Sequence, residues 1–237
     1  IEGSYISILR IGIWGAFCLL IMGNRADAME KPNVLFISVD DMNDWTSLHG
    51  GYPGRVHTPN LERLAKIGMT FVNAHTASPV CCPSRTAIML GQRPSTTGIY
   101  NNGQWWRPHL PDAVTLPMLF RRHGYKAIGA GKVFHHTAGF NPPDQWDDFQ
   151  RLTFSDDPWF RGKTLNYPWS NPTRHPAGYP FSGLPGTPHE GDWGVIPNLE
   201  ENEYDDSKTV GYAINVLRKK HERPFFLACG IFRPHLP

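Results

Sequence analysis

The chain has 237 residues, of which 40% are hydrophobic, and its formal net charge is +2 at pH 7. This length and composition place it in the ordinary globular class, with enough apolar residues to bury one sizeable core. The Lys and Arg residues are dispersed along the sequence, with no basic stripe. The charge pattern therefore argues against a nucleic-acid partner.

An apolar stretch lies near the N-terminus, from Ile11 to Met22, with Arg10 before it and the small-x-small pattern Ala-Asp-Ala after it at residues 26–28. Its length is typical of a signal-peptide core, about 7–15 residues, and falls short of the roughly 20 residues that span a bilayer. We therefore predict that residues 1–28 are a signal peptide, cleaved near Ala28. The protein would be periplasmic or secreted, with no stable membrane anchor; a buried helix or a retained anchor is the alternative.

Residues 34–39 form a nearly continuous β-branched and apolar run, which predicts a central strand covered on both faces. Asp40 and Asp41 follow at its carboxyl end, where ligands collect in open α/β sheets. Two adjacent carboxylates repel each other unless a cation lies between them, and hard oxygen ligands suit Ca²⁺ or Mg²⁺. A solvated strand end, with one Asp capping a turn, is the alternative interpretation of an isolated Asp pair.

Residues 58–68 combine a Thr cap, a Pro at the first helical position and a Gly stop, so they predict a short helix. Residues 69–72 then predict a short strand. This alternation of strands and helices predicts an α/β fold, in which a mostly parallel central sheet carries helices on both faces.

The sequence Val-Cys-Cys-Pro-Ser-Arg at residues 80–85 leads into a predicted helix over residues 84–90. Pro83 suits the first turn of that helix, so Cys81 is expected at its start. Unpaired N–H groups and the positive end of the helix dipole favour an anion there, and Arg85 adds a fixed cation. The alternative is a Cys pair that packs as small inert hydrophobes or forms a strained vicinal disulfide.

Residues 115–124 predict another capped helix, and residues 126–130 predict a strand that tolerates glycine. Lys132 and His135 follow this strand. A Lys at the carboxyl end of a strand, with a His nearby, can hold an anionic oxygen and shuttle a proton. An exposed Lys and a surface His are the alternative.

A stretch rich in Pro, Gly, Trp and Asp runs from Asn141 to about Asn198 without a sustained period. We predict that it is a variable loop that shapes the rim of the pocket, because loops usually carry specificity. The acidic pairs Asp147-Asp148 and Asp205-Asp206 do not follow a buried strand, so they predict solvated turns or caps rather than metal ligands.

Residues 207–220 place apolar side chains at helical spacing, and the cations at residues 218–220 lie near the C-terminal end, where the helix dipole favours them. Residues 225–232 predict a second buried strand, which is followed by a turn that contains His235. The strand ends of a parallel sheet share one edge, so His235 is expected beside Lys132 and the strand-end Asp pair.

Four ordered motifs resemble those of the type I sulfatases: Val39-Asp40-Asp41, Cys81-x-Pro83-Ser84-Arg85, Gly131-Lys132-x-x-His135 and the Pro-His-x-Pro turn at residues 234–237. Only Cys81 fits the first position of the Cys motif, because a pattern that begins at Cys82 would put Ser where Pro is required. Gly-Lys-Val-Phe-His and Phe-Phe-Leu-Ala look most like the iduronate-2-sulfatase branch, although His136 stands where that branch often has Pro. The resemblance covers nearly all of the predicted mature chain, residues 29–237.

This resemblance implies a metal-dependent hydrolase of sulfate esters, acting on a sulfated carbohydrate, with the alkaline-phosphatase-like α/β fold. It implies that a separate formylglycine-generating enzyme oxidises Cys81 to formylglycine, which is hydrated to a diol. One hydroxyl of the diol would attack sulfur, and the other would then expel sulfate. One Ca²⁺ ion, bound by Asp40, Asp41 and the modified Cys81, would polarise the sulfate.

The resemblance also implies roles for the remaining site residues. Arg85 and Lys132 would hold the nucleophile and the sulfate oxygens. His135 would take the diol proton, and His235 would bind sulfate near the leaving oxygen. Oxidation of Cys81 would leave two cysteines in the exported protein, Cys82 and Cys229, and the sequence leaves open whether they pair.

The family completes its metal site with later residues and adds a second Lys, and the resemblance places all of these beyond residue 237. We therefore expect residues 29–237 to be the N-terminal part of a catalytic domain, and this piece alone to leave sulfate esters uncleaved. Two other functions stay open: a phosphonate or phosphate ester hydrolase with the same fold, and a non-catalytic protein that binds sulfated glycans and keeps Cys81 as a thiol.

Overall fold

The computed structural model describes residues 31–135, 143–150 and 200–235. Every element described below belongs to one compact unit that begins at Asn33. The predicted signal peptide and most of the predicted loop over residues 141–198 lie outside the described residues. Among the described residues, no helix combines the length and apolar character needed to cross a membrane.

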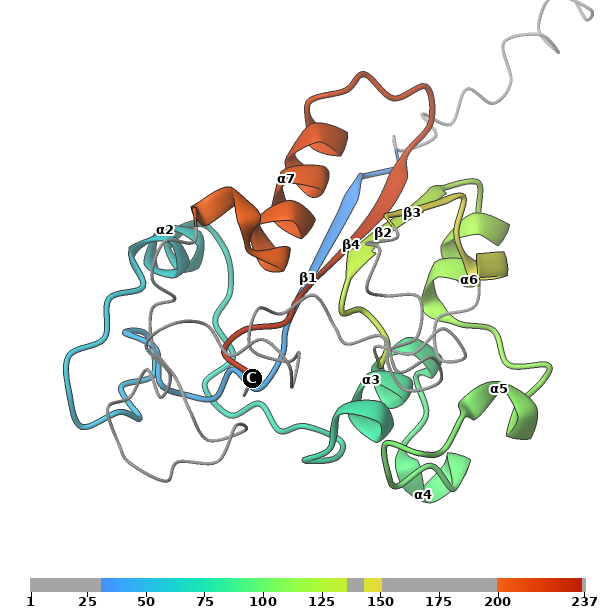
Figure 1. The fold of residues 1–237 in the computed structure, drawn as a ribbon, viewed down its shortest axis with the longest axis horizontal. Coiled ribbons are helices and arrows are strands. Elements are labelled where there is room, and N and C mark those ends of the chain that lie inside the picture. Colours follow the sequence, from blue (N-terminus) through green and yellow to red (C-terminus); the bar gives the residue numbers. More distant parts are fainter. Residues whose placement is uncertain (1–30, 136–142, 151–199, 236–237) are drawn as a thin grey trace, which may run out of the picture. The chain divides into compact units, whose positions relative to one another are not determined.

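A four-stranded parallel sheet forms the centre of this unit (Figure 1). Its spatial order is β1 (Val34–Val39), β4 (Phe225–Ile231), β2 (Lys126–Gly131) and β3 (Asp148–Gln150). The predicted parallel sheet is therefore confirmed. Because all four strands run the same way, their carboxyl ends share one edge of the sheet and their amino ends share the other.

Helices lie on both faces of this sheet, as predicted. Figure 1 shows α7 on one side of the strands and α3 and α6 on the other, in agreement with the two core clusters. The described helices are α2 (Pro59–Ile67), α3 (Cys81–Leu90), α4 (Pro94–Thr97), α5 (Trp106–His109), α6 (Leu116–Arg122) and α7 (Asp205–Leu217), with short 3-10 turns η2 (Pro143–Gln145) and η4 (Glu201–Glu203).

The side chains of β4 alternate between two hydrophobic clusters. Phe226 faces the cluster formed with α3 and α6, where its ring stacks on Phe120 at a centroid distance of 4.4 Å. Leu227 and Cys229 face the cluster formed with α7. Cys82 belongs to the first cluster, so Cys82 and Cys229, whose pairing the sequence leaves open, lie on opposite faces of the sheet. All three cysteines in the described residues are free thiols.

Two expectations about strands are wrong for the described residues. The first strand was expected to be covered on both faces, yet Leu35 and Ile37 of β1 are 45% and 52% exposed, because α7 packs against β4 and β2 instead. Residues 69–72 form no strand, and Met69 and Val72 are both 80% exposed. An apolar run predicts a strand only where a neighbour can pair with its backbone, and no described strand lies beside this segment.

The turn that ends β2 depends on two glycines. Gly131 has a φ of 69°, in the left-handed region, and a Cβ there would lie 2.1 Å from the carbonyl oxygen of Gly230 and 2.6 Å from Cγ2 of Thr209. This close approach lets the N–H of Lys132 donate to the same Gly230 oxygen at 2.9 Å. The glycines therefore set the direction in which the chain leaves the sheet edge.

We expect Gly131→Ala to lower the free energy of unfolding by about 2–4 kcal/mol, because the substitution combines a strained φ with a backbone clash. Denaturant unfolding of the intact protein measures this. The matched control is Gly211→Ala in α7, where a Cβ meets nothing within 4 Å and a helical Gly→Ala change should stabilise by up to about 1 kcal/mol. Equal effects of the two substitutions would contradict the prediction.

Candidate active site

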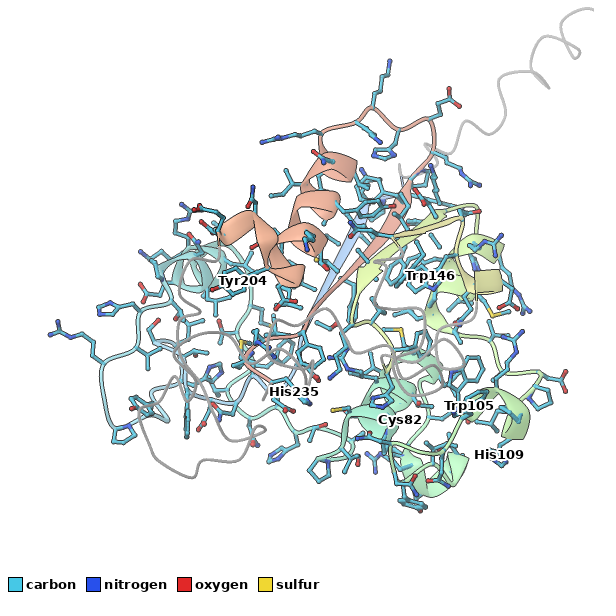
Figure 2. The ribbon with its side chains drawn as sticks, viewed as in Figure 1. Cys82, Trp105, His109, Trp146, Tyr204 and His235 are labelled. Atoms are coloured by element: carbon cyan, nitrogen blue, oxygen red, sulfur yellow. The ribbon has the colours of Figure 1, made fainter. Side chains whose placement is uncertain are left out.

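The carboxyl edge of the sheet brings together residues that are far apart in the sequence. Asp40 follows β1, Lys132 follows β2, and His235 lies in the turn after β4. The first turn of α3, marked by Cys82 in Figure 2, lies at the same edge as His235. Three strand ends and one helix start therefore define a single candidate active site.

Asp40 is the centre of this site. Its side chain is 7% exposed, its Oδ1 accepts a hydrogen bond from Nη2 of Arg85 at 2.8 Å, and its Oδ2 forms an ion pair with Nζ of Lys132. Its backbone N–H donates to the carbonyl of Ile231 at 3.0 Å, which ties it to β4. Burial by itself raises the pKa of Asp40, but the charges of Arg85 and Lys132 outweigh it and hold the pKa below its usual value.

Arg85 is fixed by the ends of two strands. Its Nη1 donates to the carbonyl oxygens of Lys132 and of Val133, the latter at 3.0 Å, and lies 3.4 Å from Oγ of Ser38. With 6% of its side chain exposed, the guanidinium is a buried cation of fixed orientation. Arg85 thus locks the start of α3 to β1 and β2.

Cys81 is the first residue of α3, so this helix begins three residues before the predicted helix at residue 84. Its Sγ lies 3.9 Å from Oδ2 of Asp40 and 3.8 Å from Nζ of Lys132. Burial raises the pKa of the Cys81 thiol although Lys132 opposes this effect. As an unmodified thiol, Cys81 therefore lacks the lowered pKa of an activated cysteine nucleophile.

Cys82 has a different environment from its neighbour. It is fully buried, and its Sγ donates to the carbonyl of Gln104 at 3.3 Å. Burial raises its pKa to about 11, and its backbone N–H donates to Oδ1 of Asn102 at 2.9 Å. Cys82 packs in the core, whereas Cys81 faces the polar site.

The two predicted histidines differ in burial and position. Nε2 of His235 lies 3.7 Å from Oδ2 of Asp41 and 3.9 Å from Oδ2 of Asp40, and its ring packs on Phe232 at 4.6 Å. His135 is 5% exposed, and burial together with the charge of Lys132 lowers its pKa to about 4. The His135 imidazole is therefore neutral at pH 7.

Ligand atoms of Asp40, Cys81 and His235 all lie within 4.8 Å of one another, so these three side chains could hold a metal ion. The predicted ligands were Asp40, Asp41 and Cys81, and the structure groups His235 with two of them. Asp41 is exposed and reaches the group through its contact with His235. A buried carboxylate oxygen in this group suits a hard divalent cation, and a thiol sulfur suits it less well.

Sequence reasoning missed one residue that holds the site together. Asp206, in the first turn of α7, accepts hydrogen bonds from the backbone N–H groups of Phe232 and Arg233, each at 2.8 Å. These bonds fix the turn that carries His235, whose own N–H donates to the carbonyl of Phe232 at 3.1 Å. The sequence shows only that Asp206 belongs to an acidic pair at the start of a predicted helix. Nothing in that local pattern indicates that its hydrogen-bond partner lies 26 residues further along the chain.

Comparison with known proteins identifies the family. The sulfatase family profile matches residues 32–237. The chain is 36% identical over 215 residues to a sulfatase of Formosa agariphila and 32% identical over 243 residues to human iduronate 2-sulfatase, and these matches cover 88% and 97% of the chain. The chain belongs to the sulfatase family. It spans about 40% of the length of these two curated relatives.

Solved structures show the same fold. A phosphonate monoester hydrolase of Agrobacterium radiobacter matches with a TM-score of 0.61 at 21% identity, over 86% of this chain and 41% of the hydrolase. A protein solved in complex with its substrate D-glucosamine-2-N,6-O-disulfate matches with a TM-score of 0.58 at 22% identity, over 87% of this chain and 35% of that protein. The sulfatase chain therefore has the predicted alkaline-phosphatase-like fold.

We expect Asp206→Ala to lower the free energy of unfolding of this sulfatase by about 1.5–3 kcal/mol, because two hydrogen bonds to a charged acceptor are lost. Hydrogen exchange at the amides of Phe232 and Arg233 should accelerate by a larger factor than exchange elsewhere in β4. Asp112→Ala, at an exposed position, is the matched control and should stay within about 0.5 kcal/mol of the parent. Unchanged exchange in the Asp206 variant would contradict the assignment.

Proposed function

We propose that the protein hydrolyses sulfate esters of a sulfated carbohydrate, with Cys81 converted to formylglycine and one Ca²⁺ ion bound at the carboxyl edge of the sheet. The observation that carries the proposal is the position of Cys81, whose Sγ lies within 4 Å of both the Asp40 carboxylate and the Lys132 ammonium. We further propose that residues 1–28 direct export and that a formylglycine-generating enzyme matures Cys81.

The relatives support the reaction and the substrate class. The curated relatives include a bacterial sulfatase and the iduronate 2-sulfatases of human and mouse, at 31–36% identity. A structural neighbour was solved with a disulfated glucosamine as its substrate. A sulfated sugar is therefore the substrate class that these comparisons favour.

Fixed cations around Cys81 suit the binding of a doubly charged developing sulfate. Lys132 already contacts Sγ of Cys81, so its ammonium would reach an oxygen of a sulfate held there. Arg85 is held rigidly by the carbonyl oxygens of Lys132 and Val133. Through these bonds and its bond to the Asp40 carboxylate, it fixes the positions of Asp40 and Lys132 relative to each other. Donors that are oriented before substrate binds cost little reorganisation when charge develops in the transition state.

The two histidines are suited to different tasks. His135 is neutral at pH 7, so it can take a proton from the hydroxyl of the matured Cys81 side chain. His235 lies on the exposed side of the site, next to Asp41, where it can contact the leaving oxygen of a substrate. The proposal therefore assigns the base to His135 and the contact with the leaving group to His235.

A divalent cation fits this site through Asp40 and Asp41, with His235 nearby, and an oxygen in place of the Cys81 sulfur would improve the fit to Ca²⁺. When bound, such an ion polarises sulfate and stabilises its developing charge. Asp40 would help to hold the ion, and Lys132, which lies beside both Asp40 and Cys81, would contact a sulfate oxygen.

A phosphonate ester hydrolase is the second candidate, because a phosphonate monoester hydrolase shares the fold with a TM-score of 0.61. Its sequence identity of 21% is lower than the 31–36% of the sulfatases. Sulfate is therefore the favoured ester. A kcat/KM for an aryl phosphonate monoester that exceeds the value for the matching aryl sulfate would reverse this choice.

We expect mass spectrometry of the full-length protein, produced together with a maturation enzyme, to find the Cys81 thiol replaced by an aldehyde. Cys81→Ala should reduce sulfate ester hydrolysis by at least about 10³-fold, because the nucleophile is removed. Cys82→Ala is the matched control: it removes the adjacent thiol, and we expect hydrolysis to persist with only a lower Tm. A thiol at position 81 in active protein would refute the proposal.

We expect a chelator to abolish hydrolysis and excess Ca²⁺ to restore it. Ca²⁺ at about 100 times its Kd should also raise the free energy of unfolding by about 2.7 kcal/mol, because it binds only the folded state. Asp40→Asn should lose this stabilisation, whereas Asp112→Asn should keep it. Full activity after exhaustive chelation, with no metal found by elemental analysis, would exclude the metal part of the proposal.

A further inference from the structure

The amino edge of the sheet, opposite the candidate active site, carries concentrated positive charge. Two segments lead into neighbouring strands at this edge: residues 121–126 into β2 and residues 218–223 into β4. Together they contain seven of the 23 Lys and Arg residues of the chain and one acidic residue, Glu222. The two segments are far apart in the sequence, but the parallel pairing of β2 with β4 brings them side by side.

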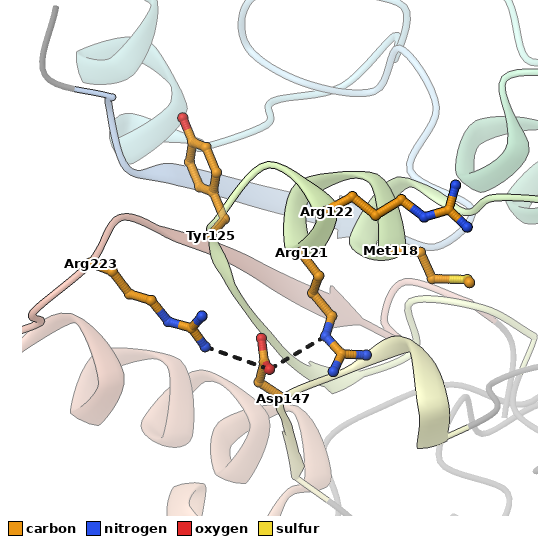
Figure 3. Close-up of a pocket in the computed structure, with 6 residues that line it drawn as sticks. All are labelled: Met118, Arg121, Arg122, Tyr125, Asp147 and Arg223. Atoms are coloured by element: carbon orange, nitrogen blue, oxygen red, sulfur yellow. Dashed lines mark ion pairs between the residues drawn. The ribbon is translucent and has the colours of Figure 1, made fainter. Parts of the chain in front are cut away.

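A pocket of about 350 Å³ opens at this edge and is lined by Met118, Arg121, Arg122, Tyr125, Asp147 and Arg223 (Figure 3). We call it the arginine pocket. With three arginines against one carboxylate, its lining has an excess of positive charge. Its residues come from α6, from the turn into β2, from the segment before β3 and from the segment before β4.

Asp147 holds two of these arginines in place. Its Oδ1 lies 3.3 Å from Nε of Arg121 and 3.5 Å from Nη2 of Arg223, and its Oδ2 accepts a hydrogen bond from the N–H of Ala127 at 2.8 Å. Figure 3 shows Arg121 and Arg223 converging on Asp147. Each guanidinium has five N–H donors, so these contacts leave donors that can reach a ligand.

Arg122 does not join this ion-pair group: in Figure 3 its guanidinium points away from Asp147. Its side chain is exposed, and within the described ranges no hydrogen bond or ion pair engages it. Arg122 is thus a cation on the pocket wall whose charge no described carboxylate neutralises.

We propose that the arginine pocket is a second carbohydrate-binding site, which takes a sulfate or carboxylate group of a sulfated oligosaccharide away from the catalytic edge. The forked guanidinium matches the paired oxygens of these groups. The substrate class rests on the proposed function. β2 has six residues and rises about 3.3 Å per residue, so the arginine pocket and the catalytic edge lie roughly 20 Å apart. Only an extended oligosaccharide chain could therefore contact both sites at once.

The pocket favours a sulfated glycan over a nucleic acid. A site for single-stranded nucleic acid usually offers exposed aromatic rings on which bases stack. The one aromatic residue that lines the arginine pocket, Tyr125, is 8% exposed, and its ring packs edge-on against Phe120 at 4.9 Å. The lining therefore recognises oxyanions rather than bases.

Titration calorimetry of the intact protein with a size-defined heparin octasaccharide tests the proposal. We expect Arg122→Gln to weaken binding by roughly threefold to fivefold, as for one exposed charge contact, and Arg122→Gln/Arg223→Gln to weaken it by about tenfold or more. The matched control is Arg63→Gln/Lys66→Gln on α2, which also removes two exposed charges and should bind like the parent. Equal losses in the two double variants would show unspecific charge attraction and overturn the proposal.

The same variants separate this proposal from the proposed function. Hydrolysis of a small aryl sulfate depends only on the catalytic edge, so Arg122→Gln should leave its kcat/KM unchanged, and Cys81→Ala should abolish it while octasaccharide binding persists. Loss of octasaccharide binding in Cys81→Ala would place all binding at the catalytic edge and overturn the pocket. Tighter binding of a single-stranded DNA of equal charge would also overturn it. Arg122→Lys keeps the charge but removes the forked guanidinium, so its octasaccharide affinity measures how much the forked donor geometry contributes to binding.

Discussion

The buried carboxylate of Asp40 is the interaction on which the site depends. Arg85 binds one of its oxygens and Lys132 the other, and all three groups are less than about a tenth exposed. Removing one member of such a cluster leaves an uncompensated buried charge, which costs more than the pairing itself contributes. The cluster therefore keeps the ends of β1 and β2 and the start of α3 in one arrangement, and Cys81, the first residue of α3, takes its position from it.

The same parallel sheet gives its two edges different properties. At the carboxyl edge, the strands deliver Asp40, Lys132 and His235 to one point, where carboxylates and cations alternate within about 4 Å. At the amino edge, Arg121 of α6 and Arg223 of the segment before β4 meet around Asp147. In a parallel sheet, the segments that lead into the strands all lie at the amino edge, and the segments that follow the strands all lie at the carboxyl edge. The candidate active site and the proposed glycan-binding pocket can therefore occupy opposite edges of one sheet.

The adjacent cysteines show how position within one helix turn decides chemistry. Cys82 faces the core cluster, where burial raises its pKa to about 11 and Gln104 accepts its S–H. Cys81, one residue earlier, faces Asp40 and Lys132. Successive residues of a helix point about 100° apart, so one thiol is sealed in the core while the other meets the polar site.

Much of the fold was available from the sequence because the strongest signals are local. The apolar run of β1, the capped helix α6 and the buried run of β4 were predicted within a few residues of their observed bounds. The three-residue strand β3 was missed, because so short a strand exists only through its pairing with β2. Residues 69–72 were assigned to a strand in error for the converse reason: a favourable pattern had no described neighbour to pair with.

The sequence by itself determined which residue types stand at strand ends and helix starts, among them Asp40, Cys81 and Lys132, and hence the family. Only the tertiary structure decided that Asp206 holds the turn of His235, and that cations from α6 and the α7–β4 connection share one pocket. The physical reason is that strand order and register set these contacts. Both depend on backbone pairing between segments that are far apart in the sequence, such as Val34 with Phe226 and Lys126 with Phe225, which no local pattern encodes.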